Sequence, residues 1–294
     1  MKQHIIDYLK QFDHTLVSPV WGGKKEFSFT CMGHLEMANS LGFELVQVTP
    51  VLYEVKPGQL TTEEQLEQIL KERKIDDSHL KHELQMLKWI KEVEPDSLKG
   101  GGCFGPLTVT SDILGVENLL KMIVKKPEFV EKVVAYVNEF IIEIAKRESR
   151  EGMDLFWIAE PLASLVSPKN FWRFSGQYLK KAFEAAGVPG FLHVCGKTIK
   201  HTPYMVDTGA EVLSIDSCTD IGECIRMVDE DVVIMGNVDT STLRFGSRQD
   251  VEREVKEILD ACKGFPNFIL STGCIIMDET PYENMMVLFE MCEL

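Results

Sequence analysis

The chain has 294 residues, with 46 acidic and 31 basic side chains, and its formal net charge is −15. Its composition, 45% hydrophobic and 26% charged, is that of an ordinary globular protein and excludes an intrinsically disordered chain. No run approaches the ~18 apolar residues of a membrane span, and the acidic balance disfavours nucleic acid or an anionic membrane as a partner. Charged residues stand near the start, where a secretory signal needs its apolar core, so we expect a cytoplasmic protein. The eight cysteines are then expected to be reduced thiols.

The first hundred residues have a mixed pattern. Residues 27–31 and 43–48 predict short strands, and the charged stretch 61–94 has helical spacing. Its start, Thr61-Thr-Glu-Glu, is typical of a helix N-terminus. The triplet Gly100-Gly-Gly predicts a flexible join between this part and the rest of the chain.

After the glycines, apolar strand-like runs alternate with amphipathic stretches. The predicted strands are residues 154–159, 190–194, 211–215, 232–235 and 267–271, and the predicted helices are 168–187, 198–209, 220–229, 247–264 and 281–293. This alternation indicates parallel strand pairing, as in a barrel or a doubly wound sheet. The glycine-rich phosphate loops Gly-x-Gly-x-x-Gly after a strand and Gly-x-x-x-x-Gly-Lys-Ser/Thr are absent. The pattern therefore favours one (β/α)8 TIM barrel domain over residues 1–294.

Polar and sulfur-bearing side chains follow the predicted strands. In a parallel barrel, functional side chains gather at the C-terminal ends of the strands. The residues found there are Glu160, His193, Cys195, Asp216, Asn237, Asp239 and Cys274. We therefore expect one imidazole, two thiols and three acids to face the same barrel mouth.

His193 and Cys195 stand two residues apart on one strand, so their side chains point to the same face. Together with Cys274 they make three soft or borderline ligands with an open position, which is the layout of a catalytic zinc site. Two thiolates neutralise the charge of zinc, so such a site suits a further anionic ligand such as a substrate thiolate. The alternative is a hydrogen-bonded core histidine beside two cysteines that only pack.

Several segments together resemble a known family. They are Phe104-Gly-Pro-Leu-Thr108, Glu160-Pro-Leu-Ala-Ser164, Phe191-Leu-His-Val-Cys-Gly196, Gly209–Asp216, Met235-Gly-Asn-Val-Asp239, Leu270-Ser-Thr-Gly-Cys274 and Thr280-Pro-Tyr-Glu-Asn284. In this order they resemble the uroporphyrinogen decarboxylase superfamily, from about residue 100 to the C-terminus. The His-x-Cys pair with a late Gly-Cys is typical of its cobamide-dependent branch, such as the methylcobamide:coenzyme M methyltransferases. The decarboxylases carry an early arginine-rich motif, whereas here no arginine precedes Arg73.

The resemblance implies a (β/α)8 barrel with His193, Cys195 and Cys274 as zinc ligands. It implies a zinc-dependent methyltransferase that moves a methyl group between a small substrate and a corrinoid. The substrate is either a thiol acceptor or an O-, N- or S-methyl donor. The corrinoid comes on a separate small protein that binds transiently. Residues 1–99 are expected to cover the barrel mouth.

Roles for the remaining site residues stay open between two alternatives. Glu160 either orients or protonates the leaving heteroatom, or is a buried acid that fixes its strand end. Asp216 and Asp239 either hold the His193 ring or cap helices. Asn237 is expected to contribute to cofactor binding.

Two other functions remain as alternatives to methyl transfer. One is a decarboxylase acting on a polycarboxylate without metal, and the other is a non-catalytic module that binds zinc or a corrinoid. Cys218 lies outside any Cys-x-x-Cys motif, so we predict a structural role for it.

Overall fold

The computed structural model describes residues 100–277 and 279–292, helix α2 (Glu63–Glu72), three two-residue strands before residue 40 and a few isolated residues between positions 60 and 92. The strand predicted at 27–31 is confirmed over β2 (Phe27–Ser28), which pairs antiparallel with β3 (Ala38–Asn39). The helix predicted from residue 61 is confirmed over α2. The strand predicted at 43–48 lies outside the described residues. Whether residues 1–99 cover the barrel mouth also stays a prediction.

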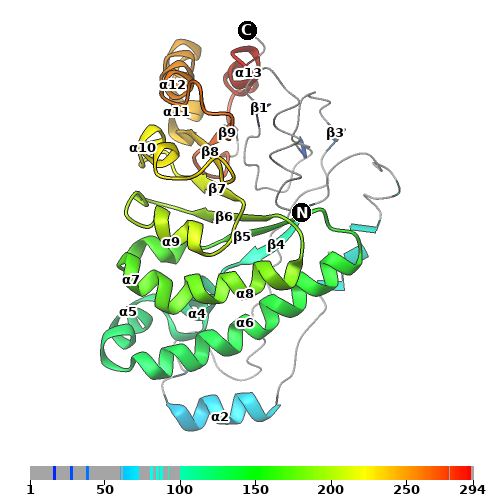
Figure 1. Ribbon diagram of the computed structural model, residues 1–294, viewed down its shortest axis with the longest axis vertical. Helices are drawn as coiled ribbons and strands as arrows, with labels where there is room; N and C mark the ends of the chain where they lie inside the picture. The colour runs from blue at the N-terminus through cyan, green and yellow to red at the C-terminus, as the bar shows by residue number, and fades with distance from the viewer. Residues whose placement is uncertain are drawn as a thin grey trace.

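Among the residues that the structure describes, seven parallel strands form the central sheet, in the order β1-β9-β8-β7-β6-β5-β4. They are β1 (Leu16–Val17), β4 (Gly100–Phe104), β5 (Leu155–Ala159), β6 (Gly190–Val194), β7 (Val212–Ile215), β8 (Val233–Val238) and β9 (Phe268–Thr272). Strand β1 pairs with β9, with Leu16 opposite Ile269, so the first strand of the chain lies beside the last. With helices between them, these strands have the parallel α/β architecture of the predicted (β/α)8 barrel, and β1 and β4 are the edges of the described sheet (Figure 1). All five strands predicted between 154 and 271 are confirmed to within a few residues.

Helices connect the strands and pack on the outer face of the sheet (Figure 1). They are α4 (Pro106–Leu114), α5 (Val116–Lys125), α6 (Pro127–Arg150), α7 (Pro168–Phe171), α8 (Gln177–Ala186), α9 (Thr202–Asp207), α10 (Ile221–Arg226), α11 (Thr240–Phe245), α12 (Arg248–Ala261) and α13 (Tyr282–Glu290), with a 3-10 turn η1 (Pro161–Leu165) and a π turn η2 (Trp172–Gly176). The predicted helical intervals 168–187, 198–209, 220–229, 247–264 and 281–293 are all confirmed in part. The long helix α6 lies beside α8 and packs against α4, so these three helices form one apolar layer on the side of β4.

The prediction of a flexible join at Gly100-Gly-Gly is wrong, because these glycines form most of strand β4. A Cβ on Gly101 would lie 2.5 Å from a carboxylate oxygen of Glu148, which belongs to α6. A Cβ on Gly102 would lie 2.0 Å from the carbonyl oxygen of Trp157 on the paired strand β5. The glycines therefore allow a close approach of backbone and helix rather than chain flexibility.

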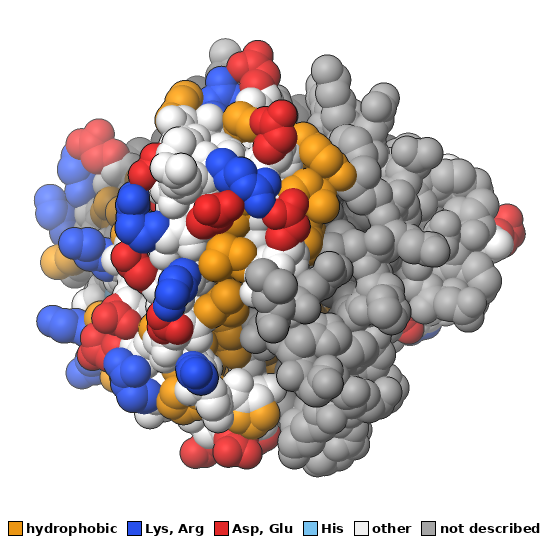
Figure 2. All heavy atoms as spheres, turned by 90° about the horizontal axis from the view of Figure 1, so that it is seen from above, with side chains coloured by type: hydrophobic (Ala, Val, Ile, Leu, Met, Phe, Trp, Pro, Cys, Tyr) orange, Lys and Arg blue, Asp and Glu red, His pale blue; other side chains and the backbone are white. Residues whose placement is uncertain are grey.

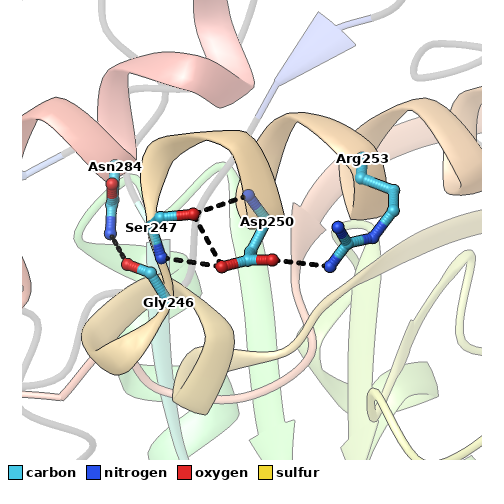
Figure 3. A network of polar contacts seen from close by, with 5 residues as sticks. All are labelled: Gly246, Ser247, Asp250, Arg253 and Asn284. Atoms are coloured by element: carbon cyan, nitrogen blue, oxygen red, sulfur yellow. Dashed lines mark hydrogen bonds and ion pairs between the residues drawn. The ribbon is translucent and has the colours of Figure 1, made fainter.

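The turn between α11 and α12 is fixed by a polar network that includes the C-terminal helix (Figure 3). Ser247 and Asp250 form a capping box at the start of α12, and Arg253 pairs with Asp250 at 2.7 Å. The amide of Asn284 on α13 donates hydrogen bonds to the carbonyls of Leu243 (2.9 Å) and Gly246 (3.0 Å). Asn284, the last residue of the segment Thr280–Asn284, therefore ties α13 to the end of α11.

Charged and apolar side chains share the surface at the end of the molecule where α12 and α13 lie. Seen from above, an apolar band runs between side chains of both charges (Figure 2). Exposed ion pairs on α12, such as Lys256 with Asp260, are worth little in stability. Phe245 and Tyr282 are exposed apolar side chains of the neighbouring helices. Among the described residues, no helix is both long and apolar enough to cross a membrane.

Candidate metal centre

Three of the predicted site residues come together at the C-terminal ends of the strands. His193 is the fourth residue of β6, Cys195 directly follows that strand, and Cys274 follows β9. The Nε2 atom of His193 lies 3.1 Å from Sγ of Cys195, and the two sulfur atoms lie 3.9 Å apart. One ligand atom from each residue falls within 4.8 Å of the other two. His193 is buried, while both cysteines are only partly covered.

Cys274 reaches the other two residues because Gly273 lets two loops touch. A Cβ on Gly273 would lie 2.4 Å from the amide nitrogen of Ser217 in the loop after β7. The amide of Gly273 also donates to the carbonyl of Val238 at 2.7 Å, which extends the pairing of β9 with β8. The Thr272 hydroxyl donates to the Cys274 carbonyl at 2.7 Å. The loop is therefore held directly before Cys274 and at the carbonyl of Cys274 itself.

The turn that carries Cys195 is held by Asp216. Gly196 has φ of 86°, a conformation that favours glycine and turns the chain away from β6. Its amide donates to Oδ2 of Asp216 at 2.9 Å, and the amide of Cys218 donates to Oδ1 at 3.0 Å. Burial raises the pKa of Asp216, but these amide donors outweigh burial and leave the pKa below its usual value. Asp216 is thus an ionised clamp between the loops after β6 and β7.

Ser214 lies against the Nδ1 edge of the His193 ring. Nδ1 of His193 lies 3.1 Å from the Ser214 hydroxyl oxygen and 3.3 Å from the Ser214 carbonyl oxygen. The two residues are register partners across β6 and β7. The carboxylates of Asp216 and Asp239 lie beyond their strand ends and accept hydrogen bonds from backbone amides there. A role of either acid in holding the ring stays a prediction.

The two thiols of the cluster share one negative charge. The hydrogen bond from the Cys195 thiol lowers the pKa of Cys274 to about 4. The same contact with Cys274, together with burial, raises the pKa of Cys195 well above its usual value. Without a cation the cluster therefore holds one thiolate, and a bound divalent cation would stabilise the second.

Glu160 lies at the end of β5, but its carboxylate is used inside the protein. It is fully buried and accepts hydrogen bonds from the amides of Leu107 (3.0 Å) and Thr108 (2.7 Å). The hydroxyls of Thr108 and Ser175 also donate to it. Burial raises its pKa, and the four donors act in the opposite direction. Helix α4 has no capping side chain of its own, so Glu160 caps it from a distant strand.

Of the two alternatives for Glu160, this geometry is that of the acid that fixes its strand end. Asp239 likewise follows the second of its alternatives, because its carboxylate accepts from the amide of Ser241 at 2.8 Å and caps α11. The amide of Asn237 donates to the carbonyls of Asp216 (3.1 Å) and Thr219 (2.8 Å). Its part in cofactor binding stays a prediction.

The donor set of the cluster fits zinc. One imidazole nitrogen and two thiol sulfurs are the ligand types that zinc takes in proteins, and three protein ligands are typical of its catalytic sites. Asp216 clamps the loop of one ligand, and Ser214 holds the ring of another. Sequence reasoning missed Ser214, although the pairing of parallel strands β6 and β7 places it beside His193.

Fold and site define a (β/α)8-barrel protein with a cluster of soft ligands at its mouth. The model of the family described as uroporphyrinogen decarboxylase (URO-D) matches residues 30–293. The chain belongs to this family, and the resemblance found in its sequence is confirmed.

Relatives within the family include methyltransferases and decarboxylases. Over 210 residues, the chain is 31% identical to the methylcobamide:CoM methyltransferase MtaA of Methanosarcina barkeri, which covers 70% of this chain and 61% of that protein. It is 28% identical to a uroporphyrinogen decarboxylase of Prochlorococcus marinus over 58% of this chain and 49% of that protein. The solved structure of a methyltransferase from Methanosarcina mazei has a TM-score of 0.67 and 25% identity, over 97% of this chain and 77% of that chain. The chain thus spans less than two thirds of the length of these two curated relatives.

Proposed function

We propose that the protein is a zinc-dependent methyltransferase that exchanges a methyl group between a small substrate and a corrinoid on a partner protein. In the direction of a thiol acceptor, a carbon–sulfur bond forms and the cobalt–carbon bond of methyl-cobalt(III) breaks. Both electrons of that bond stay on the metal, which becomes cobalt(I), and the thiol proton leaves to solvent. The observation that carries the proposal is the convergence of His193, Cys195 and Cys274 at the barrel mouth. Similarity to methylcobamide:CoM methyltransferases supports it.

His193, Cys195 and Cys274 would hold the zinc ion. When bound, zinc supplies a Lewis acid that lowers the pKa of a substrate thiol or polarises a methylated heteroatom. With two cysteine sulfurs as ligands, the chain itself offsets the charge of the cation, so a thiolate held there would keep its nucleophilicity. His193 is uncharged as a ligand and leaves this balance unchanged.

Other residues of the chain keep this ligand set in place. Asp216 holds the turn after Cys195, and Gly273 allows the Cys274 loop to approach it. Glu160 fixes the start of α4 beside the barrel mouth and contributes no free carboxylate. This argues for a site in which ligand placement, rather than a carboxylic acid, prepares the substrate.

The proposal is tested with the full chain, zinc and free methylcobalamin, with 2-mercaptoethanesulfonate as thiol acceptor. We expect about one zinc per chain and a zinc-dependent conversion of the methyl-cobalt(III) absorbance to that of cobalt(I). Cobalt(I) cobalamin with methylated thiols, amines and ethers tests the reverse direction. If no acceptor or donor changes either spectrum with zinc-loaded protein, the non-catalytic binding module replaces the methyltransferase. Release of carbon dioxide from a polycarboxylate by the zinc-free protein would favour the decarboxylase.

A further inference from the structure

The imidazole of His193 is confined on several sides by neighbouring residues. Its Nδ1 edge faces the hydroxyl and carbonyl oxygens of Ser214, at 3.1 and 3.3 Å. One face is stacked with Trp157, with 6.5 Å between ring centroids and 28° between planes. Trp157 is itself stacked on Phe191 at 5.5 Å. The Nε2 edge of the His193 ring faces Cys195.

These contacts settle which nitrogen carries the proton in the neutral ring. A backbone carbonyl accepts hydrogen bonds and cannot donate them, so the Ser214 carbonyl requires a proton on Nδ1. The Ser214 hydroxyl can rotate, and its oxygen accepts from the same N–H. The lone pair is then on Nε2, which points toward the two sulfur atoms. A ring turned over would place a carbon against the Ser214 oxygens and the wrong edge toward the cysteines.

We propose that Ser214 is a positioning residue that fixes His193 in the tautomer and orientation that ligates the metal through Nε2. This inference rests on the proposed metal-dependent function. Ser214 is fully buried and lies opposite His193 in the β6–β7 register, so its position is set by the strands rather than by a loop. Acceptors of this kind behind a ligating histidine commonly raise metal affinity 10–100-fold. The stack of Trp157 on the ring limits rotation out of this position.

The test compares Ser214→Ala with wild type and with Ser111→Ala. Ser111 is a matched control, because its side chain is also buried and its hydroxyl donates to the Thr108 carbonyl at 2.7 Å, away from the metal cluster. Zinc alone is titrated against a chromophoric chelator. We expect Ser214→Ala to bind zinc about 10-fold more weakly, since one of the two Nδ1 acceptors is lost. Ser111→Ala should bind zinc like wild type, and Ser214→Thr, which keeps the hydroxyl, should recover most of the affinity.

A second readout does not depend on metal. In 15N-histidine-labelled, zinc-free protein, the His193 signals should show a protonated Nδ1 and an unprotonated Nε2. Ser214→Ala loses the hydroxyl acceptor and keeps the carbonyl, so it should raise the share of the other tautomer without making that tautomer dominant. Unchanged zinc affinity and unchanged tautomer in folded Ser214→Ala would overturn the proposal. Failure of the proposed zinc-dependent function would give a different result, because wild-type protein would then bind zinc no more tightly than His193→Ala. The tautomer measurement would still test the role of Ser214.

Discussion

Two regions of the same barrel mouth, the ends of β6 and β9 on one side of the comparison and the end of β5 on the other, show how similar sequence signals lead to different chemistry. The ends of β6 and β9 deliver His193, Cys195 and Cys274, whose donor atoms face one another. The end of β5 delivers Glu160, whose carboxylate accepts four hydrogen bonds from α4 and from Ser175. A reactive residue type at a strand end is therefore insufficient. The end of β5 differs from the ends of β6 and β9 because the protein itself already uses the oxygen atoms of Glu160 for hydrogen bonds.

The largest effect is expected from removing one ligand of the cluster. Cys274→Ser should reduce zinc affinity by more than about 100-fold, because a hydroxyl is a far poorer ligand than a thiolate. Mutation of residues that only hydrogen-bond to metal ligands already lowers metal affinity about 10–100-fold. Zinc bound per chain after dialysis measures it. The matched control is Cys218→Ser, an exposed cysteine in the neighbouring loop, which should keep its zinc. Equal zinc loss in both variants would show that the cluster is not the site.

Glu160→Gln tests the other strand end. The amide NH2 must face either the amide of Leu107 or that of Thr108, so one buried backbone donor loses its acceptor. We expect the free energy of unfolding to fall by about 2 kcal/mol, the cost of an unsatisfied buried donor. Urea unfolding measures it. Zinc affinity should be unchanged within about twofold, since the carboxylate has no part in holding the cation.

The control for this variant is Glu117→Gln, an exposed glutamate on α5 whose pair with Lys121 is worth little. If Glu160→Gln is as stable as this control yet loses methyl transfer selectively with ether or amine donors, Glu160 is the acid after all. The comparison between the two strand ends would then fail.

Local sequence pattern was enough to predict most of the barrel. Strands after residue 154 are buried, and their apolar runs are bounded by polar segments, so their positions could be found from the pattern alone. The sequence pattern did not predict strand β4, because three consecutive glycines are typical of a flexible join. Their role depends on Glu148 and Trp157, which lie far away in the sequence.

The residues of the candidate site could be predicted from the sequence, but their hydrogen-bond partners could not. His193 and Cys195 share a face through local alternation, and the late Gly-Cys supplied the third member. The partners of Glu160, by contrast, lie 52 and 53 residues away in the helix that it caps. Ser214 is brought to His193 by strand register, which no local pattern encodes. Whether the hydrogen-bonding atoms of a side chain are already used inside the protein thus depends on tertiary structure.

Asp216 is intermediate between Glu160 and the metal-ligand residues. Its carboxylate accepts hydrogen bonds from backbone amides, and one of these amides belongs to the turn directly after Cys195. Its pKa is below the usual value in the folded protein. Its ionised form therefore stabilises the fold above the unfolded pKa of about 3.8, and this stabilisation is lost as pH falls through the lower folded pKa. Asp216→Asn should cost about 1 kcal/mol at pH 7, because the side chain is partly exposed and one acceptor remains. The difference from wild type should shrink below about pH 4. Thermal unfolding of the zinc-free proteins at pH 7 and pH 3 measures it, and a pH-independent difference would contradict the clamp.

The smallest effect is expected just beyond the two strand ends, where each loop exposes an apolar side chain. Leu165 follows β5 and is 58% exposed, and Ile275 follows Cys274 and is 43% exposed. A corrinoid protein that brings cobalt to the cluster would have to cover this rim during each turnover, through a small and partly polar contact. Leu165→Ser and Ile275→Ser should each slow transfer with the partner about threefold at subsaturating partner, the loss of part of one apolar contact. Transfer with free methylcobalamin should not change, and Val124→Ser on α5, 78% exposed, should slow neither reaction. If transfer with free methylcobalamin is slowed as well, these side chains belong to the substrate site instead. The loops after β5 and β9 would then contribute to the same reaction as His193, Cys195 and Cys274.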